Sequence, residues 1–236
     1  MKVLVIPDVH LKPWMFERAA ELMEKSSAEK AVCLMDIPDD WGKERNLVLY
    51  EETFDAAIQF QKKFHDTLWC YGNHDLSYVW NKTESGFSPF AQRTVYEKLK
   101  QLWSENTDES RFAYVHRIDN VLFIHGGLTH SYVMEYAYDM DYDDTDAILN
   151  RINDLSCNDM WYDASPIWCR PQYYTAKMYK QDDFLQIVGH TPVNQITRYR
   201  NLISCDVFST DRTGAPIGTE EFLLINTGTW EYEGIK

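Results

Sequence analysis

Five short polar motifs punctuate this 236-residue chain, and each directly follows a short run of mostly apolar residues. The motifs are Asp8-Val9-His10, Asp36-Ile37-Pro38-Asp39, Gly72-Asn73-His74-Asp75, His125-Gly126-Gly127 and Gly189-His190-Thr191. Taken singly, each motif has an ordinary structural explanation, such as a turn or a helix cap. Their shared position after apolar runs indicates instead that they contribute to one site.

The side chains in these motifs are those that bind divalent metal ions. Carboxylate, imidazole and amide oxygen ligands together suit borderline or hard divalent cations rather than a thiolate site. A carboxylate such as Asp36 can bridge two cations, and a two-metal site can hold both oxygens of an in-line displacement at phosphorus. Metal-bound water is acidified and supplies a hydroxide nucleophile. The expected ligands are Asp8, His10, Asp36, Asn73, His125 and His190.

Hydrolysis at phosphorus also needs a proton for the leaving oxygen. His74 lies directly after Asn73 in the third motif, and Asp39 lies three residues after Asp36 in the second. An imidazolium paired with a carboxylate is a suitable general acid, because the carboxylate holds the charged ring in place. We therefore predict that His74 and Asp39 form the catalytic pair.

The elements that must position these motifs alternate along the first half of the chain. Apolar runs at residues 3–6, 31–35 and 68–71 predict buried strands, and apolar periodicity at 14–25 and 53–64 predicts helices. Alternation of strand and helix predicts parallel strands joined by right-handed crossovers. Ligands bind outside the carboxyl ends of such strands, so the motifs are expected to converge there.

The second half predicts a different arrangement. Residues 112–115 and 121–124 flank Asp119-Asn120 and are expected to form a hairpin, with further strands at 185–188, 202–205 and 222–225. Together they suggest a second, mixed or antiparallel sheet packed on the first. Residues 130–183 are rich in Tyr, Trp and Asp and include an expected helix at 144–155. We therefore expect a single domain over residues 1–236, with 130–183 as an inserted cap.

Composition limits the partners and the compartment. Lys and Arg number 23 against 37 Asp and Glu, which gives a net charge of −14 and argues against a surface for long nucleic acids. Bound metal ions can still reverse the field within one cleft for a small anionic substrate. The five cysteines include no C-x-x-C pair, and Cys33 and Cys70 lie in apolar runs. We expect a cytoplasmic protein with no membrane segment.

These motifs resemble the calcineurin-like metallophosphoesterase superfamily, and within it the serine/threonine phosphoprotein phosphatase branch that also holds bacterial diadenosine tetraphosphatases. The resemblance runs from Val3 to about Asn226. It implies a four-layer α/β/β/α sandwich with the metals at the sheet ends. It implies a first metal held by Asp8, His10 and Asp36, and a second held by Asp36, Asn73, His125 and His190. It also implies the His74 and Asp39 acid pair.

Four positions depart from the patterns of this superfamily. Many relatives have Gly-His-x-His, whose second histidine binds the first metal, but here the residue is Pro192. That proline, within Gly-His-Thr-Pro, looks like the phosphoprotein phosphatase branch. Met35 stands where a glycine is usual, and Leu11 follows His10 in place of a glycine. Asp40 replaces the usual Arg that would grip the substrate phosphate.

Arg170 offers a replacement for that missing arginine. Trp168-Cys169-Arg170 resembles a Trp-x-Arg segment that supplies a phosphate-binding Arg in related bacterial enzymes. A guanidinium holds phosphate oxygens through a bidentate fork. The alternative is that Arg170 pairs with an acidic surface.

The region from 130 to 183 also contains aromatic and acidic clusters. The aromatics can stack a base, contact a peptide or form a satellite core under a long loop; they are Tyr132, Tyr136, Tyr138, Tyr142, Trp161, Tyr162, Trp168, Tyr173 and Tyr174. The acidic run has an EF-hand-like rhythm but lacks the central Gly and closing Glu, so a solvated helix N-terminus is expected; its residues are Asp139, Asp141, Asp143, Asp144 and Asp146.

Three functions fit the sequence. The favoured one is a phosphomonoesterase that acts on a phosphorylated small molecule or peptide and resembles serine/threonine phosphatases. The alternative is a pyrophosphohydrolase for dinucleoside polyphosphates or other nucleotides. A catalytically silent scaffold is disfavoured, because a scaffold does not need His74 and Asp39. The expected cofactors are two divalent metal ions, with Mn²⁺ supporting activity in vitro and Fe, Zn, Ni or Mg as further candidates.

Overall fold

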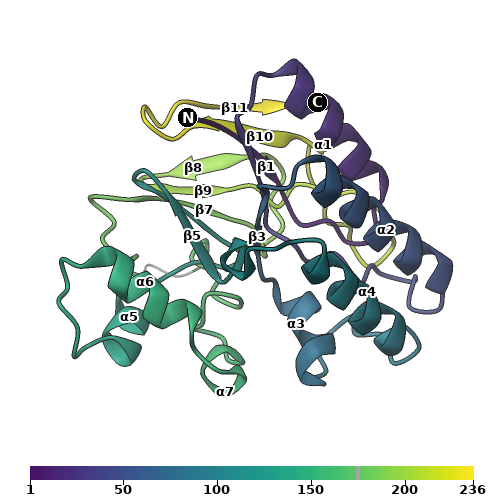
Figure 1. Ribbon diagram of the computed structural model, residues 1–236, viewed down its shortest axis with the longest axis horizontal. Coiled ribbons are helices and arrows are strands. Elements are labelled where there is room, and N and C mark those ends of the chain that lie inside the picture. Colours follow the sequence, from purple (N-terminus) through teal and green to yellow (C-terminus); the bar gives the residue numbers. More distant parts are fainter. Residues whose placement is uncertain (174–175) are drawn as a thin grey trace.

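A computed structural model describes residues 1–173 and 176–236 and shows four layers in the order helices, sheet, sheet, helices (Figure 1). One sheet has the strand order β11-β10-β1-β2-β3-β4, and the other has the order β5-β6-β7-β9-β8. The fold class predicted from the sequence, a four-layer α/β/β/α sandwich, is confirmed.

The first sheet is parallel at its centre. Its strands are β1 (Lys2–Ile6), β2 (Lys30–Cys33), β3 (Leu68–Cys70), β4 (Phe112–Ala113), β10 (Phe222–Asn226) and β11 (Tyr232–Ile235). Strands β1 to β4 pair in parallel, while β10 pairs antiparallel with β1 and β11 antiparallel with β10. The predicted strands at 3–6, 31–35 and 68–71 correspond to β1, β2 and β3.

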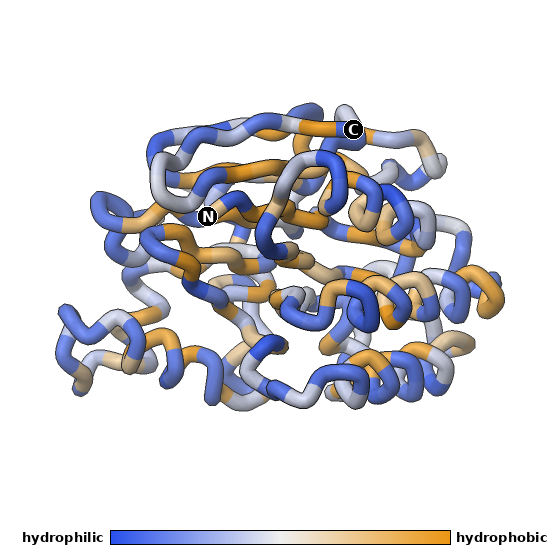
Figure 2. The backbone as a smooth tube through the Cα atoms, turned by 45° about the horizontal axis from the view of Figure 1, so that its top comes forward, coloured by the Kyte–Doolittle hydropathy of each residue, from blue (hydrophilic) through white to orange (hydrophobic). Residues whose placement is uncertain are grey.

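Both faces of this sheet are buried, which explains its uninterrupted apolar runs. Alternate side chains of β1 point to opposite faces. Val3 and Val5 pack against the second sheet, whereas Leu4 and Ile6 pack against helices. Apolar positions accordingly run along the strands in the middle of the molecule, while the outer helices alternate between polar and apolar residues (Figure 2).

Helices α1 (Trp14–Lys25), α2 (Leu47–Lys63) and α4 (Gln92–Ser104) cover the outer face of the first sheet, and α3 (Asn73–Trp80) follows β3 (Figure 1). The helix predicted at 14–25 has the bounds of α1. The one predicted at 53–64 begins earlier, because the Asn46 side chain accepts the Leu49 N–H and caps the helix there. A 3₁₀ turn, η1 (Glu109–Arg111), precedes β4.

The second sheet is mixed, as predicted. Its strands are β5 (Val115–Ile118), β6 (Val121–Ile124), β7 (Leu185–Val188), β8 (Thr197–Tyr199) and β9 (Leu202–Ser204). β6, β7 and β9 pair in parallel, and β5 and β8 pair antiparallel with β6 and β9. The predicted strands at 185–188 and 202–205 correspond to β7 and β9.

Two strand assignments from the sequence were wrong. The hairpin partner of 121–124 is β5, not residues 112–115, because the chain leaves the first sheet at Tyr114. Asn153 accepts the N–H groups of Tyr114 and Val115 at 3.1 and 2.9 Å and so satisfies this crossing backbone. The strand predicted at 222–225 belongs to the first sheet as β10. An apolar run buried on both faces fits either sheet, so composition does not reveal its partner.

Residues 130–183, predicted as a cap, contain helices on the outer face of the second sheet (Figure 1). These are α5 (His130–Tyr136), α6 (Thr145–Asn153) and α7 (Cys157–Met160). α6 lies within the predicted range 144–155, and the Asp144 side chain caps it by accepting the Ala147 N–H at 3.0 Å. The division into a single domain with a cap stays a prediction.

The aromatic cluster of this segment mostly packs inward. Tyr132 is buried, and Tyr136, Trp161, Tyr162 and Trp168 pack against the same apolar cluster. Tyr138, Tyr142 and Tyr173 are exposed, and Tyr174 lies outside the described residues. Most of the cluster is therefore a satellite core. Within the described residues, no helix has the length and apolar character needed to cross a membrane.

Candidate metal centre

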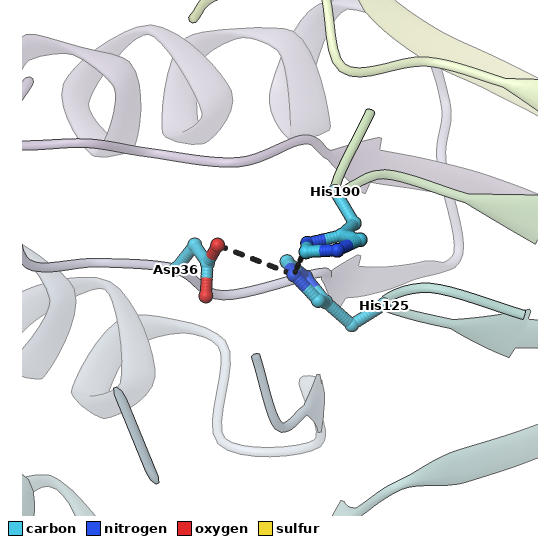
Figure 3. Close-up of side chains that lie close together, drawn as sticks. All are labelled: Asp36, His125 and His190. Carbon is cyan, nitrogen blue, oxygen red and sulfur yellow. Dashed lines mark hydrogen bonds and ion pairs between the residues drawn. The ribbon is translucent and has the colours of Figure 1, made fainter. Parts of the chain in front are cut away.

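The six predicted ligands all lie just beyond the carboxyl ends of parallel strands. Asp8 and His10 follow β1, Asp36 follows β2, and Asn73 follows β3; His125 and His190 follow β6 and β7 of the other sheet. Because the strands of both sheets end at the same edge, side chains far apart in sequence meet there. Figure 3 shows Asp36, His125 and His190 pointing toward one another.

His125 Nε2 lies at the centre of one group of donor atoms. It is 3.2 Å from Asp36 Oδ2, 3.1 Å from Asn73 Oδ1 and 3.2 Å from His190 Nδ1. The other ring nitrogen, Nδ1, is 2.8 Å from the Leu34 carbonyl oxygen and donates to it, which leaves the lone pair of Nε2 toward the group. Burial alone would lower the pKa of His125, but the Asp36 and Asp8 carboxylates raise it to about 9. This field favours a cation at that point.

A second group consists of Asp8, His10 and Asp36, whose ligand atoms all lie within 4.8 Å of one another. His10 Nδ1 donates to the Asp39 carbonyl oxygen at 2.9 Å, so Nε2 is its free nitrogen. Asp8 Oδ1 accepts the His190 N–H at 2.6 Å, while Asp8 Oδ2 is buried without a hydrogen-bond partner. A buried carboxylate oxygen without a partner is costly, and a bound cation would satisfy it. The residues present therefore fit divalent metal ions.

The backbone at these strand ends is left-handed. His10, Asp36 and His190 have φ values of 44°, 43° and 60°, which non-glycine residues adopt at a cost. Asp75 stabilises one of these turns, because its carboxylate accepts the N–H groups of Asp36 at 2.8 Å and Ile37 at 3.1 Å. Met35 also has a positive φ, 58°, a conformation that glycine adopts more readily than methionine.

Two glycines permit the close approach of the carboxylates. A Cβ atom on Gly72 would overlap Asp36 Oδ1, and one on Gly189 would overlap Asp8 Oδ2. Gly72 directly precedes Asn73, and Gly189 directly precedes His190. In each motif the glycine therefore leaves room for a carboxylate beside the predicted ligand that follows it.

His74 and Asp39 form a buried pair beside the metal groups. His74 Nδ1 is 3.0 Å from Asp39 Oδ2. The other carboxylate oxygen, Oδ1, accepts the hydroxyls of Tyr50 at 2.7 Å and Tyr78 at 2.5 Å. Burial lowers the pKa of His74, but the charge of Asp36 and hydrogen bonds to Asp39 and Glu84 raise it well above its usual value. The ring is therefore held in the form that can donate a proton.

A cleft of about 160 Å³ contains these groups. Among its lining residues are His10, Asp36, His74, Arg170 and His190. Arg170 Nη1 donates to the His190 carbonyl oxygen at 2.8 Å and to Thr191 Oγ1 at 3.3 Å, which holds the guanidinium at the cleft rather than at an acidic surface.

Asp40, which stands in place of the usual phosphate-binding arginine, also lines the cleft. Its Oδ2 lies 3.6 Å from Lys12 Nζ, and both side chains are largely buried. Asp40 Oδ1 also accepts the Thr210 hydroxyl. This position therefore carries an ion pair instead of a free cation, so it does not take over the role of the missing arginine.

Sequence reasoning missed several residues of the site. Asp206 lies just beyond β9 and lines the cleft, and its buried Oδ2 has no hydrogen-bond partner. Its position after an apolar run was the same signal that identified the other ligands. Tyr50, Tyr78 and Glu84 come from helices and a loop, and no spacing in the sequence connects them to Asp39 or His74.

Comparison with solved structures shows a similar fold. The cold-active protein-tyrosine phosphatase of the psychrophile Shewanella sp. aligns with a TM-score of 0.63 at 16% identity, over 100% of this chain and 80% of that one. Another structure of a cold-active protein tyrosine phosphatase aligns with a TM-score of 0.59 at 17% identity, over 99% of this chain and 78% of that one. A novel archaeal phosphodiesterase aligns with a TM-score of 0.44 at 16% identity, over 100% of this chain and 99% of that one. At these identities the likeness concerns the fold.

No curated protein sequence matches this chain. The family model described as calcineurin-like phosphoesterase, however, matches residues 1–215, which is most of the chain and includes all six predicted ligands. Members of this family require divalent metal ions and hydrolyse phosphoesters, and the donor groups described above fit that requirement. The chain therefore belongs to the calcineurin-like phosphoesterase family and is a phosphoester hydrolase.

Proposed function

We propose that this protein is a dinuclear metal-dependent phosphomonoesterase of the phosphoprotein phosphatase type. The observation that carries the proposal is the convergence of six metal-binding side chains beside a buried His74–Asp39 pair in one small cleft. Asp8, His10 and Asp36 would hold one ion, and Asp36, Asn73, His125 and His190 the other. When bound, such ions polarise phosphoryl oxygens and lower the pKa of water, which supplies a nucleophile at neutral pH.

The protein's own residues then orient the substrate and move a proton. Asp39 accepts from His74 Nδ1, so Nε2 is the nitrogen that donates to the leaving oxygen. The hydroxyls of Tyr50 and Tyr78 donate to Asp39 and hold its carboxylate in place. Arg170, which His190 and Thr191 hold at the cleft, would donate to the substrate phosphate. A silent scaffold would have no use for this buried pair.

The dimensions of the cleft support a monoester substrate. Typical pockets that enclose a whole small molecule measure roughly 300–1,000 Å³. A cleft of about 160 Å³ accommodates a phosphoryl group and leaves the rest of the substrate outside. A phosphorylated small molecule or a phosphorylated side chain of a peptide fits this description.

A nucleotide pyrophosphohydrolase is the second candidate, and one observation favours it. Trp41 and Trp168 both line the cleft, and indole rings can stack on a base. Trp168 also packs edge-on against His190, with ring centroids 5.6 Å apart, and the Arg212 guanidinium lies over the Trp41 ring, 5.4 Å from its centroid.

A substrate panel tests both candidates. The protein, reconstituted with Mn²⁺, is assayed on phosphopeptides, aryl phosphates, mononucleotides and dinucleoside polyphosphates. We expect phosphomonoesters to give the highest kcat/KM, and highest activity on dinucleoside polyphosphates would favour the second candidate. With the fold intact, Asp36→Asn should remove activity and His74→Asn should leave only a small measurable part of it, whereas His65→Asn, a change away from the site, should affect neither. Lack of any Mn²⁺-dependent hydrolysis would refute the proposal.

A further inference from the structure

A second carboxylate contacts the proposed acid. His74 Nδ1 lies 2.8 Å from Glu84 Oε1, closer than its 3.0 Å contact with Asp39 Oδ2. Glu84 lies in the loop between α3 and α4, outside all five sequence motifs, and its side chain is 5% exposed. Nδ1 carries a single proton and directs it to Asp39, so Glu84 Oε1 meets the ring as a close ion-pair contact and not as a second hydrogen-bond acceptor.

The remaining contact of the Glu84 side chain also lies in the site. Asn73 Nδ2 donates to Glu84 Oε2 at 3.5 Å, a long hydrogen bond. This contact directs the Asn73 amide so that its oxygen faces His125 Nε2. Within the described residues, the Glu84 carboxylate forms no ion pair with Lys or Arg. The partners of Glu84 are therefore Asn73, a proposed metal ligand, and His74, the proposed acid. A salt bridge with a surface lysine or arginine does not account for its position.

Asp39 does not make Glu84 redundant. Its Oδ1 accepts two tyrosine hydroxyls, and those hydrogen bonds withdraw electron density from the carboxylate. Glu84 Oε1, by contrast, is buried and accepts no hydrogen bond, and its one close polar contact is the ion pair with His74. A second buried carboxylate therefore holds the His74 ring, and among the described residues it makes no ion pair with Lys or Arg.

We propose that Glu84 is a positioning residue for His74: its contact with Nδ1 fixes the orientation of the ring, so that Nε2 faces the leaving group. The role rests on the proposed function. In the step concerned, a hydroxide derived from water, whose proton has passed to solvent, bonds to phosphorus as the bond from phosphorus to the leaving oxygen breaks. The His74 Nε2–H bond breaks and a new O–H bond forms on the leaving group. His74 becomes neutral, and its Nδ1 proton stays hydrogen-bonded to Asp39, beside Glu84.

The test uses Glu84→Gln, which keeps the size of the side chain, with Glu97→Gln on the exposed face of α4 as the matched control. A proton donor matters most when the leaving group is poor. In the Mn²⁺ enzyme, we expect Glu84→Gln to lower kcat on phenyl phosphate about tenfold more than on 4-nitrophenyl phosphate. Mn²⁺ affinity should change only a few-fold, because the contact with Asn73 is long. Glu97→Gln should match the wild type.

Two further measurements make the outcome decisive. In a His74→Asn background, Glu84→Gln should have no additional effect on kcat, as expected for residues that act as a unit. The low-field proton resonance of His74 Nδ1–H should shift in Glu84→Gln, and this readout does not depend on activity. Equal losses on both substrates, with or without weaker Mn²⁺ binding, would overturn the proposal, as would an unshifted resonance. A wild-type protein without Mn²⁺-dependent hydrolysis would instead contradict the proposed function.

Discussion

Asp75, the last residue of Gly-Asn-His-Asp, holds the turn that carries Asp36. It is fully buried, and its two oxygens accept the N–H groups of Asp36 and Ile37 at 2.8 and 3.1 Å. Asp36 itself has a φ of 43°. We expect that replacing Asp75 will release this strained turn and move the carboxylate shared by both metal groups.

The size of the effect follows from the two hydrogen bonds. An unsatisfied buried N–H costs about 1–3 kcal/mol, so Asp75→Ala, which leaves two of them, should lose about 4 kcal/mol of unfolding free energy. Asp75→Asn keeps one acceptor and should lose about 2 kcal/mol. Burial and then the charge of Asp36 raise the pKa of Asp75 to about 7, so removal of the charge relieves some repulsion and keeps the loss for Asn small.

Urea unfolding of the metal-free protein measures the stability, and calorimetric titration with Mn²⁺ measures the metal affinity. Loss of a residue that orients a metal ligand typically lowers affinity about 10- to 100-fold, and we expect this for Asp75→Asn. The control is Asp144→Ala, which removes the cap of α6, should cost about 1 kcal/mol and should leave Mn²⁺ binding unchanged. Wild-type stability together with wild-type Mn²⁺ affinity in Asp75→Asn would refute this account of the turn.

Three more outcomes are expected. Burial lowers the pKa of His116 to about 4. Since the unfolded chain binds that proton near pH 6.5, stability should fall by up to about 3 kcal/mol from pH 6.5 to 4 in urea titrations, and His116→Gln should remove this component. Gly72→Ala should weaken Mn²⁺ binding at least about tenfold by calorimetry, because its Cβ overlaps Asp36 Oδ1, whereas Gly228→Ala should not. Arg170→Ala should raise KM for an aryl phosphate more than it lowers kcat in steady-state assays.

The sequence predicted site residues where polar side chains directly follow strands that are buried on both faces. Strands such as β1 and β2 are buried on both faces, so they appear as continuous apolar runs, and the residues just beyond them stand out as polar. The position of Asp36 and His190 at strand ends could therefore be predicted. The partner of β10 could not, because an apolar run of this kind suits either sheet.

Residues that support the site from other elements left no comparable signal. Tyr50 and Tyr78 lie on different helices and meet only at the Asp39 carboxylate. Tertiary packing alone creates that contact, and no periodicity distinguishes these tyrosines from core residues. Asp206 is a different case, because it follows β9 as the predicted ligands follow their strands. It was missed because no known motif surrounds it.

The charge balance of the cleft gives the metal ions a second role, in binding. The site gathers six carboxylates in or beside the cleft: Asp8, Asp36, Asp39, Asp40, Glu84 and Asp206. Lys12 is committed to Asp40, which leaves Arg170 to face substrate. A phosphate dianion would be repelled by this field in the metal-free protein, because interactions are strong in a partly desolvated cleft. Divalent ions reverse the sign of that field.

Removal of the metals should therefore abolish binding of phosphate as well as hydrolysis. Calorimetry with inorganic phosphate, with and without Mn²⁺, measures the loss of binding separately from the loss of hydrolysis. Phosphate binding of equal strength in the metal-free protein would show that Arg170 and the protonated His74 ring outweigh the carboxylates.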